Sequence, residues 1–489
     1  MMNKEKTIGW NFDNSYSNLP KSFIYEISPV PVKRPELVIF NHDLADQMGL
    51  NFSNVDNEQL AKMFSGNLLP KGSKSLAQAY AGHQFGHFTM LGDGRAVLLG
   101  EHISKSNQRL DIQFKGSGQT PFSRNGDGRA ALGPMLREYL ISEAMHSLNI
   151  PSCRSLAVVE TGEKVIREKK YPGAILTRVS KSHIRIGTFQ FAIIHENKNL
   201  LEQLFNYTIE RHFPEIIGSK NKGIDFLYAV IEQQASLITS WMRVGFIHGV
   251  MNTDNVALSG ETIDYGPCAF LDNYNPLTVF SSIDHQGRYA FANQPVISQW
   301  NLARLAETIL PLININQEHA IKLAEEAINS FTELYQNKWL DMMRLKIGLS
   351  TRELRDKDLI ADLLNIFEKN NADFTNTFRS LSESSLFDKE IFLSEEFNHW
   401  QSKWKARLKN ESKTLEEIKK VMELNNPTVI PRNHIVEKAL KNAEKGDLIL
   451  FKELNKILKT PYISRKDINE DFLSPPKESE KVLQTFCGT

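Results

Sequence analysis

The sequence predicts an α+β fold of two lobes, one rich in strands and one helical, with a cleft between them. At 489 residues, the chain is longer than a single ordinary core, which favours two or three packed lobes. A helix is expected over 134–148, and beyond residue 190 apolar side chains recur at helical spacing, most clearly over 224–244. Four segments have the composition typical of strands: 96–103, 109–114, 155–160 and 173–179.

Composition divides the chain into four parts. Residues 1–70, rich in Asn and Pro, are expected to form an N-terminal extension, and 71–187 the strand-rich lobe. Residues 188–345 form the helical lobe. Residues 346–489 are charged and helical, and the segment from Pro475 onward has no periodic pattern, which predicts a flexible tail.

The charge balance narrows the classes of ligand. The chain has 58 basic and 58 acidic residues, whereas broad binding to nucleic acid or to an anionic membrane requires a basic surplus. We therefore expect neither as a partner. A small anion held in a pocket is the favoured ligand.

Cysteine usage and hydropathy favour a cytoplasmic protein, which we expect to be a monomer. Cys153, Cys268 and Cys487 are far apart in the sequence, so neither a disulfide scaffold nor a zinc site is predicted. The first residues lack the apolar run of a signal peptide. No stretch reaches the ~18 apolar residues that a membrane span requires.

A lysine at the end of a strand and a glutamate in the following helix form the first candidate pair. Lys115 follows the strand expected at 109–114, and Glu138 lies in the helix expected at 134–148. In protein kinases, a helix glutamate orients a strand lysine toward the phosphates of ATP. Taken alone, such residues are more often surface charges, so the assignment depends on further motifs.

The most specific motif is the polar loop 248–255, followed by Asp264-Tyr265-Gly266. Kinases have a His-x-Asp loop with a downstream Asn, then a strand pair and Asp-x-Gly. Asn255 and Asp264 match the two metal-binding positions, and oxygen ligands of this kind suit Mg²⁺ or Mn²⁺. A short hairpin is expected between them, with its turn at 259–260.

Val250 stands where a kinase carries its catalytic aspartate. Valine cannot accept a proton, so ordinary phosphoryl transfer is disfavoured. Asp254 is the acidic residue within the loop and is the candidate base. An aspartate at this position could instead cap the loop.

Several segments together resemble the selenoprotein O family. The resemblance covers most of the chain, is strong over 75–300 and is weaker in the helical carboxy-terminal third. It depends on six segments: Gly82-His83-Gln84-Phe85-Gly86, Leu91-Gly92-Asp93-Gly94-Arg95, 111–118, 123–130, 248–255 and 264–270.

The resemblance implies a protein-kinase-like fold and a specific reaction. Members of the family are atypical pseudokinases that bind ATP in a flipped orientation and transfer AMP to protein hydroxyl groups. It implies Mg²⁺ or Mn²⁺ at Asn255 and Asp264, Asp254 as proton acceptor, and protein substrates with Ser, Thr or Tyr acceptors, with UTP as a possible second nucleotide. The nucleotide-binding residues that it implies are Gly92, Gly94, Arg95, Lys115, Asp127, Gly128, Arg178, Arg185 and Asp264.

The chemistry of these residues agrees with that implication. Arginine and lysine side chains suit a triphosphate, and guanidinium groups bind phosphate in bidentate fashion. Gly92 and Gly94 flank Asp93 in a predicted turn between strands, where backbone can approach a ligand closely.

Two other functions remain open at this point. Asp254 could serve as the base of a phosphotransferase, or the chain could be a nucleotide-binding scaffold without turnover. The presence of both metal-ligand candidates, Asn255 and Asp264, argues against the scaffold.

Cys268 and Cys487 form a candidate redox pair. Cys487 is the third residue from the end, where the resembled family carries selenocysteine or cysteine, and Cys268 lies four residues beyond Asp264. A tail can bring a thiol to the cleft at small loop-closure cost. The alternative is that Cys268 is a small buried hydrophobe and Cys487 an idle thiol.

Overall fold

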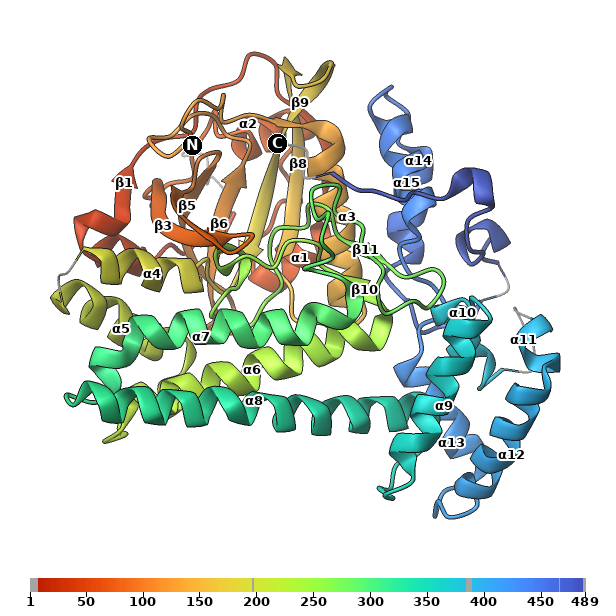
Figure 1. Cartoon of the computed structure of the whole chain (residues 1–489). Helices are drawn as coiled ribbons and strands as arrows, with labels where there is room; N and C mark the ends of the chain where they lie inside the picture. Colours follow the sequence, from red (N-terminus) through yellow and green to blue (C-terminus); the bar gives the residue numbers. More distant parts are fainter. Residues whose placement is uncertain (1–7, 196–197, 384–388, 466, 487–489) are drawn as a thin grey trace.

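The computed structural model of the chain describes residues 8–195, 198–383, 389–465 and 467–486. They form two lobes with a helical carboxy-terminal region beside them (Figure 1). The predicted kinase-like, two-lobed α+β fold is confirmed. None of the helices over these residues is long and apolar enough to cross a membrane.

A nine-stranded antiparallel sheet organises the first lobe. Its strand order is β1-β3-β5-β6-β9-β8-β2, with β4 paired to β3 and β7 to β9. The strands are β1 Ile24–Glu26, β2 Glu36–Phe40, β3 Leu76–Gln84, β4 His87–Gly92, β5 Ala96–Ile103, β6 Arg109–Lys115, β7 Ala130–Ala131, β8 Arg154–Ile166 and β9 Lys170–Ser180. The predicted strands are all present, and β8 and β9 extend beyond their predicted bounds.

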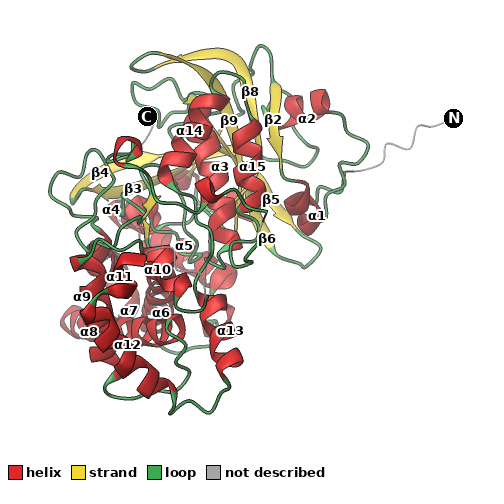
Figure 2. Cartoon of the chain, turned by 90° about the vertical axis from the view of Figure 1, so that its right-hand side faces the viewer, coloured by secondary structure: helices red, strands yellow, loops and turns green. Residues whose placement is uncertain are grey.

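The helix α3, Leu132–Ser147, is buried around most of its circumference. One side packs against β8 and β9 and the other against α14, Asn433–Ala443 (Figure 2). A helix with this environment needs apolar residues all round rather than on one stripe. Two shorter helices, α1 His42–Met48 and α2 Asn57–Phe64, pack against β8 and β2.

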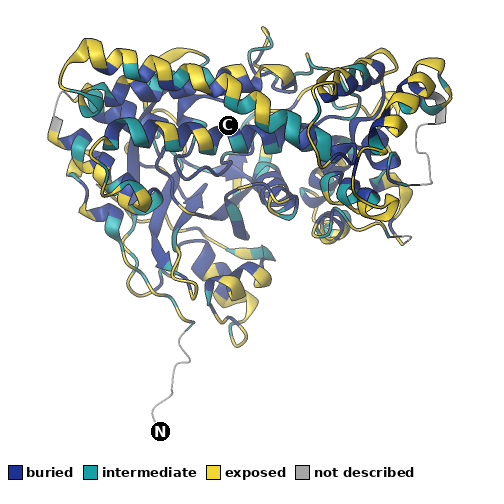
Figure 3. Cartoon of the chain, turned by 90° about the horizontal axis from the view of Figure 1, so that it is seen from below, coloured by how far each residue is buried: buried dark blue, intermediate teal, exposed yellow. Residues whose placement is uncertain are grey.

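Long helices form the second lobe. They are α4 Ile186–Ile194, α5 Lys198–His212, α6 Lys222–Val244, α7 Gln294–Ile313 and α8 Gln317–Lys346. The helices α6, α7 and α8 pack on one another. Seen from below, their exposed residues follow the outer sides and their buried residues face the interior (Figure 3).

The hairpin predicted between the two metal-ligand candidates is reduced to one antiparallel bridge, between Val256 and Thr262, with a turn at 258–259 between them. Ala257 bridges instead to Arg185, and Thr262 also bridges to Ser152. The short strands of this region are β10, Phe246–Ile247, and β11, Ala269–Phe270, which pair with each other.

The carboxy-terminal region shares its core with the two lobes. One cluster of buried side chains includes residues from α3, α6 and the carboxy-terminal helices. Trp400 and Trp404 stack 5.4 Å apart within it, and their indole nitrogens donate to the carbonyls of Leu359 and Ile347. The helices are α9 Asp356–Lys369, α10 Phe374–Ser380, α11 Lys389–Leu393, α12 Glu395–Leu408, α13 Leu415–Asn425, α14 and α15 Ile449–Ile457.

The segment expected to be a flexible tail is anchored at one residue of its described part. Thr485 is buried, its backbone nitrogen donates to the carbonyl of Phe280 at 2.7 Å, and its hydroxyl donates to the carbonyl of Pro267 at 2.6 Å. A parallel bridge joins it to Ser281. A single anchoring residue has no periodicity, so the sequence pattern could not show it. Cys487 lies outside the described residues.

Candidate active site

A cleft of about 870 Å³ lies where the sheet faces the loops of the second lobe. Strands β3 to β6 and β9 supply one wall, and the segment from Val250 to Pro267 supplies the other. The cleft brings together the predicted site residues of both lobes: Gly92, Gly94, Arg95, Lys115, Asp127, Gly128, Arg178, Arg185, Asp254, Asn255 and Asp264.

Strand register places the cations of the first lobe side by side. Arg178 on β9 is paired with Gln113 on β6, and Lys115 lies two residues further along β6. Residues two apart on a strand share a face, as do residues directly opposite on an antiparallel partner. The side chains of Lys115 and Arg178 therefore point to the same side, toward α3 and the cleft.

Glu138 and Asp264 hold these two cations. Lys115 Nζ lies 2.7 Å from Glu138 Oε2 and 3.0 Å from Asp264 Oδ1. Arg178 bonds to the other oxygen of Glu138 through Nε and to Asp264 Oδ1 through Nη2. The predicted lysine–glutamate pair is thus part of a four-residue network that also fixes the metal-ligand candidate.

The electrostatics keep both carboxylates charged. Burial opposes the charge of Asp264, but Arg178, Lys115 and Arg185 hold its pKa well below the ordinary value. Burial likewise opposes the charge of Glu138, and Arg178 and Lys115 lower its pKa. Lys115, Arg178 and Arg185 all line the cleft, where their side chains can meet the charge of an anionic ligand such as a phosphate chain.

Asp264 is also held in a strained backbone conformation. Its φ is 62°, in the left-handed region that a residue with a Cβ rarely adopts. Such a conformation costs on the order of 1–3 kcal/mol and persists where its surroundings over-determine it. Here the surroundings are the side chains of Lys115 and Arg178.

Asp254 lies in the short turn Thr253–Asn255, with 8% of its surface exposed. Its Oδ1 is buried and accepts no hydrogen bond from the residues that the structure describes. Burial raises the pKa of Asp254 to about 6, against the opposing effect of Arg185, whose guanidinium donates to the Asp254 carbonyl at 3.0 Å. A carboxyl with a pKa close to neutral suits a general base.

Glycine at position 82 allows strand β3 to approach this aspartate. A Cβ added to Gly82 would lie 2.4 Å from Asp254 Oδ1 and 2.9 Å from its Cγ. No side chain could occupy that space without displacing the carboxyl. The Gly82-His83-Gln84 segment therefore has a steric reason to begin with glycine.

Asn255 and Asp264 supply oxygen atoms that fit a divalent cation. The amide nitrogen of Asn255 donates to the Val250 carbonyl at 3.0 Å, which leaves its side-chain oxygen for a ligand. The described residues hold no cluster of three His, Cys, Asp or Glu side chains. Mg²⁺ usually takes one or two protein oxygens and completes its shell with phosphate and water, so this donor set suits it.

Asp127 lies at the rim of the cleft rather than in its interior. Both of its oxygens bond to Arg167, at 2.9 and 3.0 Å. These bonds lower its pKa. Next to it, Gly128 has a φ of 66°, and an added Cβ would meet the Gly118 backbone at 2.1 Å. Together these residues shape the loop that borders the cleft.

Sequence reasoning missed several residues of the site. Tyr80 lies beneath Arg185, with the guanidinium carbon 4.2 Å from the ring centroid. Asn252 accepts from the Phe85 backbone nitrogen at 3.0 Å and from the Tyr289 hydroxyl at 2.7 Å. Tyr80 lies on the same strand face as Gly82, and the strand period could have shown it. The contacts of Asn252 depend on the tertiary fold.

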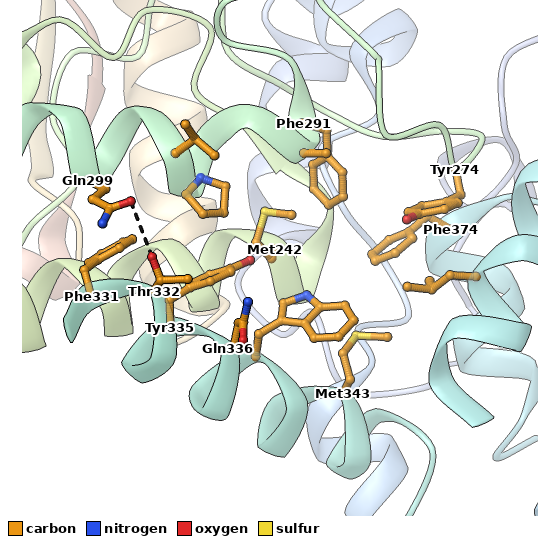
Figure 4. A pocket seen from close by; sticks show the side chains of 15 residues that line it. Met242, Tyr274, Phe291, Gln299, Phe331, Thr332, Tyr335, Gln336, Met343 and Phe374 are labelled. Atoms are coloured by element: carbon orange, nitrogen blue, oxygen red, sulfur yellow. Dashed lines mark hydrogen bonds between the residues drawn. The ribbon is translucent and has the colours of Figure 1, made fainter. Parts of the chain in front are cut away.

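A second pocket, of about 340 Å³, has a different chemistry (Figure 4). It lies between α7 and α8 and is lined mainly by apolar and aromatic side chains, among them Phe331, Tyr335 and Trp339. The predicted site residues do not line it. The polar cleft is therefore the candidate active site.

The chain combines a protein-kinase-type fold with a cationic cleft and paired oxygen ligands, but it has valine at the usual base position. These features define an atypical kinase-like enzyme that acts on nucleotides. The family described as Protein adenylyltransferase SelO matches residues 6–459. The chain belongs to this family, which confirms the resemblance seen in the sequence, and it is a nucleotidyltransferase.

Its relatives match over their full length. Proteins named Protein nucleotidyltransferase YdiU from Pelagibacter ubique, Nitrosococcus oceani and Brevibacillus brevis are 58%, 55% and 54% identical to this chain. The alignments cover 99%, 99% and 100% of this chain and 100%, 99% and 100% of the relatives.

Solved structures also match, among them ROP2 from Toxoplasma gondii, described as a virulence factor with a protein-kinase fold and no enzymatic activity. The match has 9% identity and a TM-score of 0.24 and covers 69% of this chain and 88% of that one.

Proposed function

We propose that this nucleotidyltransferase transfers AMP from ATP to Ser, Thr or Tyr hydroxyl groups of proteins and releases pyrophosphate. UTP is the alternative donor. The observation that carries the proposal is the pair Val250 and Asp254: the usual base position cannot take a proton, and a neighbouring carboxyl of raised pKa lines the same cleft.

The proposed reaction occurs at the α-phosphorus. The acceptor hydroxyl gives its proton to Asp254, its oxygen bonds to the α-phosphorus, and the bond from that phosphorus to the bridging oxygen breaks, so that pyrophosphate leaves with the electron pair. The ATP lies in the flipped orientation that the family resemblance implies. Attack at the α-phosphorus explains why a base at position 250 is not needed.

The residues of the first lobe bind the phosphates in this proposal. Lys115, Arg178 and Arg185 meet the charge of the chain, and Gly92 and Gly94 allow backbone to approach it. Asn255 and Asp264 would hold Mg²⁺ or Mn²⁺, which neutralises charge on the phosphate oxygens when bound. Asp127, Gly128 and Arg95 border the nucleotide at the rim.

Labelled ATP separates the proposal from its alternatives. We expect the protein and its targets to become labelled from [α-³²P]ATP but not from [γ-³²P]ATP, and Asp264→Ala to abolish the labelling. Label from the γ-position would instead establish a phosphotransferase with Asp254 as base. Nucleotide binding without either label would establish a scaffold.

We also propose that Cys268 and Cys487 form a reversible disulfide. The Thr485 hydroxyl binds the carbonyl of Pro267, the residue before Cys268. Two residues of extended chain span at most ~7 Å, so Thr485 anchors the tail within that reach of the segment around Pro267. The pair would tie the tail to the segment that follows Asp264.

A further inference from the structure

Arg137 connects the metal-ligand loop to the carboxy-terminal region. It lies on α3 beside Glu138, with 5% of its surface exposed, and the two side chains point in different directions. Whereas Glu138 faces the sheet, Arg137 reaches α14, which lies against α3 in Figure 2. Its guanidinium has four acceptors: Glu437 Oε1 at 2.8 Å, Asn433 Oδ1 at 2.9 Å, the Cys268 carbonyl at 2.6 Å and the Gly266 carbonyl at 3.2 Å.

The loop 264–268 is therefore held at both ends by neighbouring residues of one helix. At its start, Lys115 and Arg178 join Asp264 to Glu138. Two and four residues later, the carbonyls of Gly266 and Cys268 accept from Arg137. Within the loop, the Gly266 nitrogen also donates to the Asp264 carbonyl at 2.9 Å. A shift of Arg137 would thus move the backbone that carries Asp264.

The position of Arg137 is in turn set by α14. Asn433 and Glu437 are one turn apart, on the same face of that helix. The start of α14 is fixed by Arg432, whose Nη1 lies 2.7 Å from Asp272 and 2.5 Å from Asp373. Asp272 follows strand β11, and β11 directly follows the loop 264–268. Through Arg432, the start of α14 is therefore bound to the segment in which this loop ends.

We propose that Arg137 is a positioning residue through which α14 sets the geometry of Asp264, so that the carboxy-terminal region controls how tightly the metal and nucleotide bind. The inference rests on the metal-ligand role proposed for Asp264. A purely structural guanidinium would affect only the stability of the fold. A positioning residue must also change the affinity of the loop for its ligand at equal stability.

Direct binding measurements distinguish these two roles. Mn²⁺ binding would be followed by electron paramagnetic resonance in the presence of α,β-methylene-ATP. In this analogue a methylene group replaces the oxygen that bridges the α- and β-phosphorus atoms, so AMP cannot be transferred. We expect Arg137→Met to raise the half-saturating Mn²⁺ concentration by ~10-fold. Arg137→Lys keeps the charge but cannot reach all four acceptors, and a smaller shift of ~3-fold is expected.

Arg407→Met is the matched control. Arg407 is also a buried arginine, with 7% of its surface exposed, and it bonds to Asp356 at 2.7 Å and Glu411 at 2.9 Å, away from the cleft. We expect this variant to lower the melting temperature without changing Mn²⁺ binding.

Three results would overturn the inference. The first is native Mn²⁺ binding by a folded Arg137→Met protein. The second is an equal rise of the half-saturating Mn²⁺ concentration in Arg407→Met. If Arg137→Met does not fold, Glu437→Gln removes the outer anchor instead, and native binding by that variant is the third. Asp264→Ala separates the inference from the proposed function. If this variant binds Mn²⁺ as the native protein does, the metal role of Asp264 is refuted. If Asp264→Ala loses Mn²⁺ binding while Arg137→Met keeps it, only the positioning role of Arg137 is refuted.

Discussion

Asp254→Asn should abolish transfer and at the same time stabilise the protein. The amide has nearly the same volume as the carboxyl but cannot accept the proton. Burial raises the pKa of Asp254 from its ordinary value of 3.8 to about 6. That difference corresponds to ~3 kcal/mol at most, because keeping the buried carboxyl ionised disfavours the folded state.

The sign of the pH dependence follows from the raised pKa. Below pH 3.8 the carboxyl is protonated in both the folded and unfolded states. As the pH rises toward 6, the unfolded state loses its proton first, so the stability of the native protein falls relative to the asparagine variant. The advantage of Asp254→Asn should therefore grow between about pH 4 and pH 6 and then remain constant.

Activity should rise over the upper part of the same range. With a pKa of about 6, ~10% of the Asp254 carboxyl is ionised at pH 5 and ~90% at pH 7, so kcat/KM should increase by ~10-fold between them. Asp264 stays ionised throughout, because its pKa is held well below the ordinary value.

Urea unfolding at several pH values tests the expected gain in stability of Asp254→Asn. Initial rates of α-label transfer test the expected rise in activity with pH. Glu261→Gln is the control, since burial raises the pKa of that carboxyl to about 7 and it binds the Lys181 nitrogen at 2.8 Å outside the cleft. It should gain stability at neutral pH and keep its activity. Substantial transfer by Asp254→Asn, or a flat activity profile from pH 5 to 7, would refute the assignment of the base.

Three further predictions concern the metal, the valine and the cysteines. Asp264→Ala and Asn255→Ala should each lower α-label transfer by at least ~100-fold, with circular dichroism showing an intact fold; near-native labelling by the first variant would exclude its metal role. Val250→Asp should not create an efficient kinase, and robust transfer of label from [γ-³²P]ATP would contradict the flipped orientation. Mild oxidation with diamide, which takes up the two electrons and two protons of the thiols, should join Cys268 to Cys487 and alter labelling; a dithiol should reverse it and Cys487→Ser should prevent it. Two free thiols in non-reducing peptide maps, with unchanged labelling, would disprove the pair.

Local sequence motifs predict one part of the site. Lys115 ends a strand, Asn255 lies in a polar loop, and Asp264 begins Asp-Tyr-Gly, and each position follows from its neighbours in the chain. The nucleotide-binding role proposed for Arg178 comes only from the family resemblance. Its contact with Asp264 depends on the register of β6 against β9, which residue patterns alone do not specify.

The contacts between distant segments were not predictable in this way. Arg137 and Glu437 are 300 positions apart, and neither belongs to a motif. Thr485 similarly anchors the tail through one hydroxyl and one backbone nitrogen. Hydrophobic periodicity reports the face that an element buries, but it contains no information about which polar side chain meets which carbonyl across a packed interface.

The cleft concentrates features that oppose folding, and the rest of the molecule must offset them. The left-handed Asp264 costs on the order of 1–3 kcal/mol, and the buried Asp254 adds up to ~3 kcal/mol at neutral pH. Their sum is a large fraction of the ~5–15 kcal/mol by which a typical domain is stable. Packing α14 and its neighbours against the far side of α3 extends the apolar core through all three regions, and it does so at the helix that carries Glu138 and Arg137. The carboxy-terminal region thus supplies stability at the place where the site requires it.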